Sequence, residues 1–157
     1  PYTELLLKIY GRLGVDVTVA AAPGPAAAES ATRIRVNDRG YGVIRFERIG
    51  ANCAVELAQA LRDVCSLGAS SVQLSASASD PGLTQLITAA RGLGFFFCGL
   101  GPGFADGEDL FLMQRLSEPL DTGKLQLFTD EAKEMTAFIA ADRQTVNSAT
   151  LTSPSKT

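Results

Sequence analysis

The sequence predicts an α/β domain with a mixed, mostly antiparallel sheet flanked by helices. Segments with apolar residues at helical spacing alternate along the chain with short apolar or alternating runs that are typical of strands. Gly, Pro, Asn and Asp residues separate these segments, as in short connections between packed elements. With 157 residues, 46% of them hydrophobic and 20% charged, the chain has the size and composition of one soluble globular domain.

The first 31 residues predict a helix followed by little that can pack. Apolar residues at helical spacing predict a helix over residues 2–13, which Gly14 ends. A weak short strand follows within residues 15–19. The Pro/Gly/Ala-rich residues 20–31 are expected to form a flexible linker.

The next segments predict a hairpin and a βαβ-like continuation. Residues 33–36 and 41–48 form two strands around the turn Asn37-Asp38-Arg39-Gly40. An amphipathic helix then begins at Cys53 and ends at Gly68, and residues 72–76 form a strand.

The second half predicts one further helix in the core, several strands and a C-terminal helix. Asp80-Pro81 begins a helix that continues to Gly92, with Asp80 as its cap. The wholly apolar run 95–98 predicts a central strand. The remaining predictions are strands over 109–116 and 124–128, a helix over 129–143 and a disordered polar tail over 147–157. Residues 1–146 thus form one domain, with 1–19 and the linker before a core of 32–146.

The cluster Gly99-Leu100-Gly101-Pro102-Gly103 follows a strand as a phosphate-binding loop would. Such a loop needs a helix directly after the glycines, because the N–H groups of the helix N-terminus hold the phosphates. Turn residues and a strand follow instead, so the cluster is interpreted as a connection between two strands.

Composition excludes several classes of function. The net charge is −3, and the Lys and Arg residues are scattered, which argues against nucleic-acid binding. No segment is long and apolar enough to span a membrane. Cys53, Cys65 and Cys98 form no C-x-x-C pair, which favours reduced thiols and a cytoplasmic location. The chain has no His, so the usual triads and zinc sites are excluded, and no metal site is expected.

The order of elements over residues 33–116 resembles the second half of the GNAT N-acetyltransferase fold. The stretch "ARGLGFFFCG" resembles the late helix of that family, which ends in a Leu-Gly-Phe step. The stretches "LLLKIYGRLGV", "LGFFFCGLGPGFADGEDLFLMQRL" and "LQLFTDEAKEMTAFI" together resemble the C-terminal GNAT-like half of bacterial multidomain proteins with an acetyltransferase or anti-sigma ATPase upstream. The resemblance implies a GNAT-like fold that is incomplete on its N-terminal side, where the family places its acceptor-substrate half.

The resemblance also implies where acetyl-CoA would bind. The family binds the CoA pyrophosphate at a Gln/Arg-x-x-Gly-x-Gly/Ala turn before a helix, and only Gly50 matches its place in that pattern here. The candidate cofactor-binding residues are Arg48, Ile49, Gly50, Ala51 and Asn52. Alternatively, Gly50 and Asn52 only turn the chain and cap the helix. A free helix N-terminus facing an open cleft would favour CoA, whereas a filled cleft would favour packing alone.

The sequence assigns no catalytic residue. Many members of the family use a Tyr four residues before the Gly of the Gly-Phe step, and Ala90 stands there. Asp106, Glu108 and Asp109 form an acidic cluster that either attracts a substrate amine or is a solvated loop.

Two functions therefore remain open, beside a third and more remote one, a generic α/β ligand-binding domain unrelated to CoA. The first is a GNAT-like module without catalysis that senses a ligand or packs against other domains of a larger bacterial protein. The second is an acetyl-CoA-dependent N-acetyltransferase acting on an amine. A homodimer or an upstream domain is expected to cover the exposed edge of the sheet.

Overall fold

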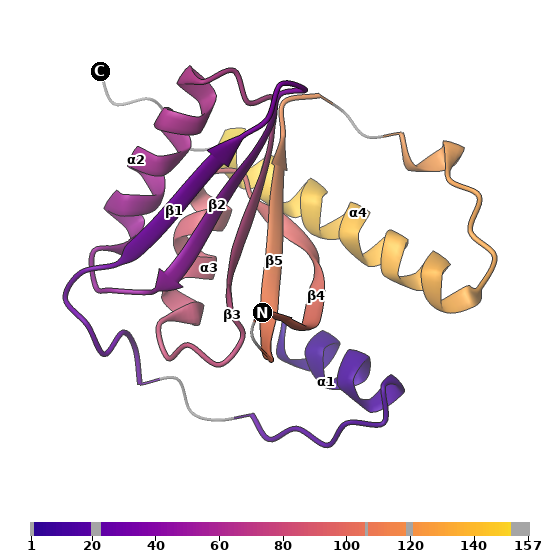
Figure 1. Ribbon diagram of the computed structural model, residues 1–157. Helices are drawn as coiled ribbons and strands as arrows, with labels where there is room; N and C mark the ends of the chain where they lie inside the picture. The colour runs from indigo at the N-terminus through magenta and orange to yellow at the C-terminus, as the bar shows by residue number, and fades with distance from the viewer. Residues whose placement is uncertain (1, 20–22, 106, 119–120, 152–157) are drawn as a thin grey trace.

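The computed structural model describes residues 2–19, 23–105, 107–118 and 121–151. Its centre is a five-stranded sheet in the order β1-β2-β3-β5-β4 (Figure 1). The strands are β1 (Ala31–Val36), β2 (Tyr41–Arg48), β3 (Ser71–Ser77), β4 (Phe96–Ala105) and β5 (Glu108–Leu116). The helices are α1 (Thr3–Arg12), α2 (Cys53–Ser66), α3 (Leu83–Gly92), the short 3-10 helix η1 (Thr122–Lys124) and α4 (Asp130–Leu151).

The sheet is mixed, as the sequence predicts. β2 and β3 are parallel because α2 connects them as a crossover, and the other three neighbouring pairs are antiparallel. This confirms the predicted fold class and the predicted order of hairpin, helix, strand, helix and two strands from β1 to β5.

One face of the sheet carries the core. Alternate residues point to the same face of a strand, so Ile44, Leu74, Met113 and Phe97 lie side by side across four strands. All four side chains are buried, and α2 and α3 pack over them (Figure 1). The burial of such large apolar side chains stabilises the fold by roughly 1.5–3 kcal/mol each.

A buried polar cluster joins both ends of the chain to this core. Asp142 of α4 accepts hydrogen bonds from the Tyr2 hydroxyl (2.7 Å) and from the Phe97 N–H (2.8 Å). Arg91 of α3 forms an ion pair with Asp142 and also donates to the Tyr2 hydroxyl. The Tyr2 ring packs against Phe97, Phe111 and Phe138. α1, α3, β4 and α4 therefore meet at one carboxylate.

β4 differs from the prediction in place and length. It is the edge strand rather than a central one, and it continues through the glycine cluster to Ala105. The apolar run is buried because α4 covers the edge: Asp142 binds the Phe97 N–H, and the Arg143 guanidinium lies 5.4 Å from the centre of the Phe96 ring. A register shift between Gly101 and Ala105 accommodates the glycines within the strand.

Three other predictions are wrong. Residues 124–128 form no strand, since η1 and an extended segment occupy this region. Residues 15–19 form no strand either. α4 continues past residue 143 to Leu151, so residues 147–151 of the expected tail are helical, while 152–157 lie outside the described residues.

The expected linker is also not free over its described end. Residues 27–30 lie against the turn between β2 and α2, and Ala27 forms an isolated parallel bridge with Gly50. Residues 20–22 lie outside the described part. None of the helices in the described residues has both the length and the apolar character needed to cross a membrane.

Candidate functional site

The candidate cofactor-binding residues form the turn between β2 and α2. Arg48 is the last residue of β2, and Cys53 is the first of α2, so the N–H groups of residues 49–52 lie at the helix N-terminus. Such N–H groups attract anions when they are free, because they lack partners within the helix and lie at the positive end of its dipole. Whether the site can bind a pyrophosphate therefore depends on what these groups already contact.

The chain's own residues 27–30 occupy this turn. The Gly50 N–H donates to the Ser30 hydroxyl at 2.9 Å, and the Ala51 N–H donates to the Ala27 carbonyl at 2.9 Å. The Asn52 N–H donates to the Ala28 carbonyl at 3.3 Å. We call residues 27–30 the covering segment, because they take the donors that an anion would need.

Two side-chain contacts hold the covering segment from the other direction. The Asn52 carboxamide accepts the Ser30 N–H at 2.8 Å instead of capping α2, for which no side-chain bond forms. The Arg48 guanidinium donates to the Glu29 carbonyl at 3.3 Å. The side chains of Arg48 and Asn52, two of the five candidate cofactor-binding residues, are thus engaged with the covering segment.

Gly50 permits this contact because it has no side chain. A Cβ at Gly50 would lie 2.2 Å from the Glu29 carbonyl carbon and 2.5 Å from the Ser30 nitrogen, far inside van der Waals contact. The glycine that matches the CoA pattern therefore lets the chain's own backbone approach the turn.

Asp80 closes the remaining side of the turn. Its carboxylate accepts the Ile49 N–H at 3.1 Å and the Gly82 N–H at 2.7 Å. Gly82, rather than Asp80, is the residue directly before α3. Asp80 therefore joins the turn to the start of α3 and places a carboxylate where a phosphate would be repelled.

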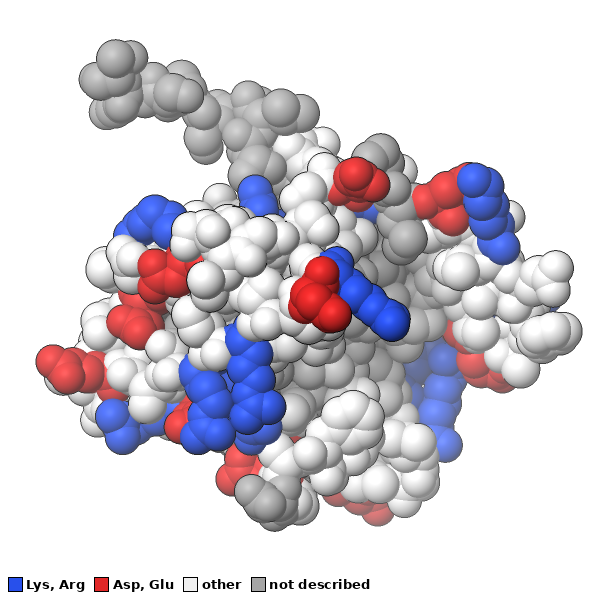
Figure 2. Space-filling model, turned by 45° about the horizontal axis from the view of Figure 1, so that its top comes forward, with Lys and Arg blue, Asp and Glu red and all other residues white. Residues whose placement is uncertain are grey.

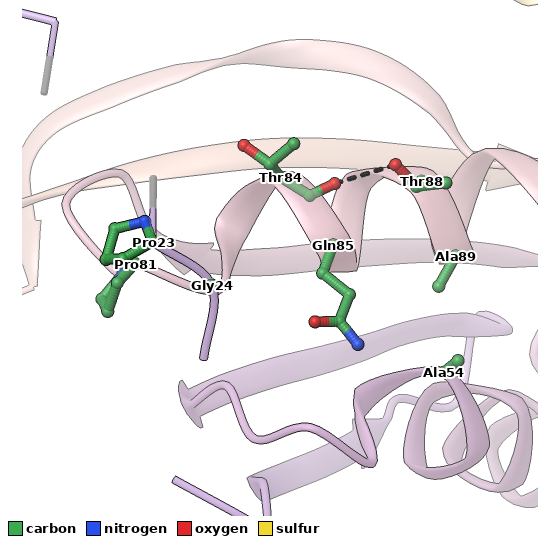
Figure 3. A pocket seen from close by; sticks show the side chains of 8 residues that line it. All are labelled: Pro23, Gly24, Ala54, Pro81, Thr84, Gln85, Thr88 and Ala89. Atoms are coloured by element: carbon green, nitrogen blue, oxygen red, sulfur yellow. Dashed lines mark hydrogen bonds between the residues drawn. The ribbon is translucent and has the colours of Figure 1, made fainter. Parts of the chain in front are cut away.

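An uncharged cavity of about 470 Å³ lies beside the turn, between the beginning of α2 and α3 (Figure 3). Its lining residues are Pro23, Gly24, Ala54, Pro81, Thr84, Gln85, Thr88 and Ala89. The Gln85 amide donates to the Ala51 carbonyl, and the Thr88 hydroxyl donates to the Thr84 carbonyl. The cavity therefore has no charged group that would hold a diphosphate.

None of the tyrosines is placed as a free acid for a leaving thiolate. Ala90, where the family has Tyr, is fully buried. The Tyr10 hydroxyl donates to Asp109 and the Tyr41 hydroxyl to Gln73, as Tyr2 does to Asp142. Burial raises the pKa of Tyr10 to about 12 and also raises the pKa of Tyr2 and Tyr41, which makes each phenol a weaker acid.

The acidic cluster is not a shared site either. Asp109 accepts the Tyr10 hydroxyl and the Gly103 N–H, so its carboxylate fixes α1 and β4 to the start of β5. Glu108 is exposed, and Asp106 lies outside the described residues.

The cysteines offer no reactive thiolate. Burial raises the pKa of the Cys53 and Cys98 thiols, which keeps both protonated. Among the described residues, no three Asp, Glu, Cys or His side chains come together as a metal site.

Sequence analysis missed that Ala27, Ala28 and Ser30 close the turn, and that Asp80 binds the Ile49 N–H. The covering segment lies in a stretch that is rich in Ala and Pro and carries no periodic pattern that would place it in the fold. Only Ser30 gave a signal, since a Ser one residue before a strand offers a hydroxyl that accepts a backbone N–H.

Comparison with known proteins gives a partial structural likeness. No protein-family model and no curated protein matches this sequence. Nourseothricin acetyltransferase matches with a TM-score of 0.43 and 16% identity, over 57% of this chain and 58% of that one. The NatC complex bound to Gag peptide and CoA matches with a TM-score of 0.41 and 11% identity, over 59% and 60%. Ribosomal-protein-alanine N-acetyltransferase from Brucella melitensis matches with a TM-score of 0.40 and 19% identity, over 73% and 76%.

The first and third of these solved structures are named as acetyltransferases and the second as a complex bound to CoA, and the first two are matched over only about three fifths of their own length. The likeness concerns the fold of the backbone. What the turn of this chain can bind depends on its own contacts.

Proposed function

We propose that this chain is a GNAT-like module without acetyltransferase activity, which packs against other domains of a larger protein. The observation that carries the proposal is the closed turn: the N–H groups of Ile49, Gly50, Ala51 and Asn52 are all bound by the chain itself. A pyrophosphate would have to displace these bonds and approach the Asp80 carboxylate.

The other requirements of acetyl transfer support the same proposal. Direct transfer needs a base for the amine and an acid for the thiolate. The chain has no His, Ala90 replaces the expected Tyr, and Asp109 is occupied by Tyr10 and Gly103. We therefore place the acetyl-CoA-dependent N-acetyltransferase second.

The test is calorimetric titration of acetyl-CoA into the wild-type chain and into Gly50→Ala, in which the covering segment must move. The wild-type chain is expected to bind no acetyl-CoA at about 1 mM, the concentration that corresponds to roughly 4 kcal/mol of binding free energy. Gly92→Ala is the matched control, since a Cβ at Gly92 meets nothing within 4 Å. Micromolar binding by the wild-type chain would overturn the proposal and support the acetyltransferase. Binding by Gly50→Ala alone would show that the covering segment blocks the site.

A further inference from the structure

The face of the sheet opposite α2 and α3 is open over β1, β2 and β3 (Figure 1). Ile34 of β1 and Ile44 of β2 are partners on the covered face, so the residues next to them in each strand point to the other side. We call the surface of Arg33, Arg35, Val43, Arg45 and Gln73 the open face. It continues to β1, the last strand of the sheet on this side.

Positive charge gathers at this edge. Arg33 and Arg45 are direct partners in the β1–β2 pair, and Arg35 is the partner of Val43. Figure 2 shows a group of adjacent Lys or Arg side chains toward the lower left, with Asp or Glu side chains at its border. Like charges directly opposite each other destabilise a sheet, so this arrangement has a cost within the isolated chain.

The chain itself supplies little compensation for these charges. Glu47 forms an ion pair with Arg33 at 2.7 Å, but both side chains are about half exposed. Over the described residues, the guanidinium groups of Arg35 and Arg45 have no hydrogen bond or ion pair. Carboxylates from outside the chain would therefore find two unpaired guanidinium groups.

The edge of β1 also offers backbone groups. Among the strands that the structure describes, β1 pairs only with β2, and α2 lies behind both strands. In an antiparallel edge strand, the N–H and C=O groups of alternate residues point away from the sheet and can bind another strand. The opposite edge, β4, lacks this property where Asp142 of α4 binds the Phe97 N–H.

We infer that β1 binds an acidic β-strand of a partner, which extends the sheet and places carboxylates at alternate positions opposite Arg33 and Arg35. Residues two apart on a strand share a face, so the spacing of the two arginines fixes the spacing of the acids. A second copy of this chain fits poorly, because antiparallel β1–β1 pairing would bring Arg33 and Arg35 of both copies onto one face. The inference rests on the proposed packing function and names the kind of partner.

The experiment uses two synthetic peptides with the intact chain: one alternates Glu with Val and Thr, and its counterpart has Gln in place of Glu. The Glu peptide is expected to shift the NMR signals of the β1 amides and to bind at least about tenfold more tightly, with an affinity that falls as salt is added. Arg35→Glu is expected to remove the difference between the peptides. Arg62→Glu, which changes the net charge equally on the exposed surface of α2, is expected to preserve it.

The inference would be overturned if both peptides bind equally, or if the shifted NMR signals belong to amides outside β1. It would also be overturned if the Glu peptide does not bind at about 1 mM. Dimerisation of the wild-type chain through β1 would assign this edge to a second copy and would also overturn it. None of these results depends on acetyl-CoA, so failure here is distinguishable from failure of the proposed function.

Discussion

Replacement of Gly50 by Ala tests the closed turn most directly. The new Cβ would lie 2.2 Å from the Glu29 carbonyl carbon, and the obstacle is backbone, so the covering segment must move away from the turn. Five hydrogen bonds then break: those from the N–H groups of Gly50, Ala51 and Asn52, that from the Ser30 N–H, and that from the Arg48 guanidinium to the covering segment. At a net value of about 1 kcal/mol each, their loss sets an upper limit of about 5 kcal/mol.

The expected decrease in the free energy of unfolding is about 2–4 kcal/mol, because water replaces some of the lost partners in this half-exposed segment. Urea denaturation measures the decrease, and amide hydrogen exchange locates it. Exchange at Gly50, Ala51 and Asn52 is expected to accelerate by roughly thirtyfold to seven-hundredfold, at about 1.4 kcal/mol for each factor of ten. Gly92→Ala is the control, and it is expected to leave both quantities nearly unchanged or to stabilise α3 slightly. Unchanged exchange at the three amides of Gly50→Ala would refute the reasoning.

Two further predictions concern the buried polar groups. Asp142→Ala leaves Arg91 without its ion-pair partner in a largely buried place, and it is expected to lower the free energy of unfolding, measured by urea denaturation, by about 3–5 kcal/mol. The control, Lys133→Ala on the exposed surface of α4, is expected to lower it by under about 1 kcal/mol. A loss below about 1 kcal/mol for Asp142→Ala would contradict the role of the cluster. Because the fold raises the pKa of Tyr2 and Tyr10, their stabilising contribution is complete below about pH 10 and is lost as the pH rises from there toward 12. Tyrosinate absorbance is expected to stay low at pH 10 in the folded chain and to reach about half in urea; equal absorbance in both would contradict this prediction.

The fold was predictable where local signals agreed. The turn Asn37–Gly40 predicted the hairpin, and helical spacing before Gly68 predicted α2, which ends two residues earlier, at Ser66. These signals depend on neighbours in the sequence, so a single chain suffices to read them.

The errors arose where distant segments decide the environment. The apolar run of β4 predicts a central strand, but α4 buries this edge of the sheet, with Asp142 binding Phe97 from 45 residues downstream. Polar residues 147–151 predict a tail, although α4 continues through them.

The candidate site shows the same limit. Gly50 was predicted to lie in a CoA-binding turn or only to turn the chain, and its sequence context could not reveal which segment approaches it. The answer lies in residues 27–30, an Ala-rich segment whose contacts are backbone bonds. Carbonyl groups are present in every residue, so such contacts leave no mark in the composition of the segment.

The Asp142 cluster has a consequence for how this protein is made. The bond from Tyr2 to Asp142 joins residues 140 positions apart, and Asp142 also holds Arg91 and the edge of β4. A ribosome synthesises the sheet and α3 long before it reaches this carboxylate. We therefore expect the nascent chain to expose the Phe97 edge and the Arg91 side chain until α4 has left the exit tunnel. For this protein, the core cannot be completed before α4 has been synthesised.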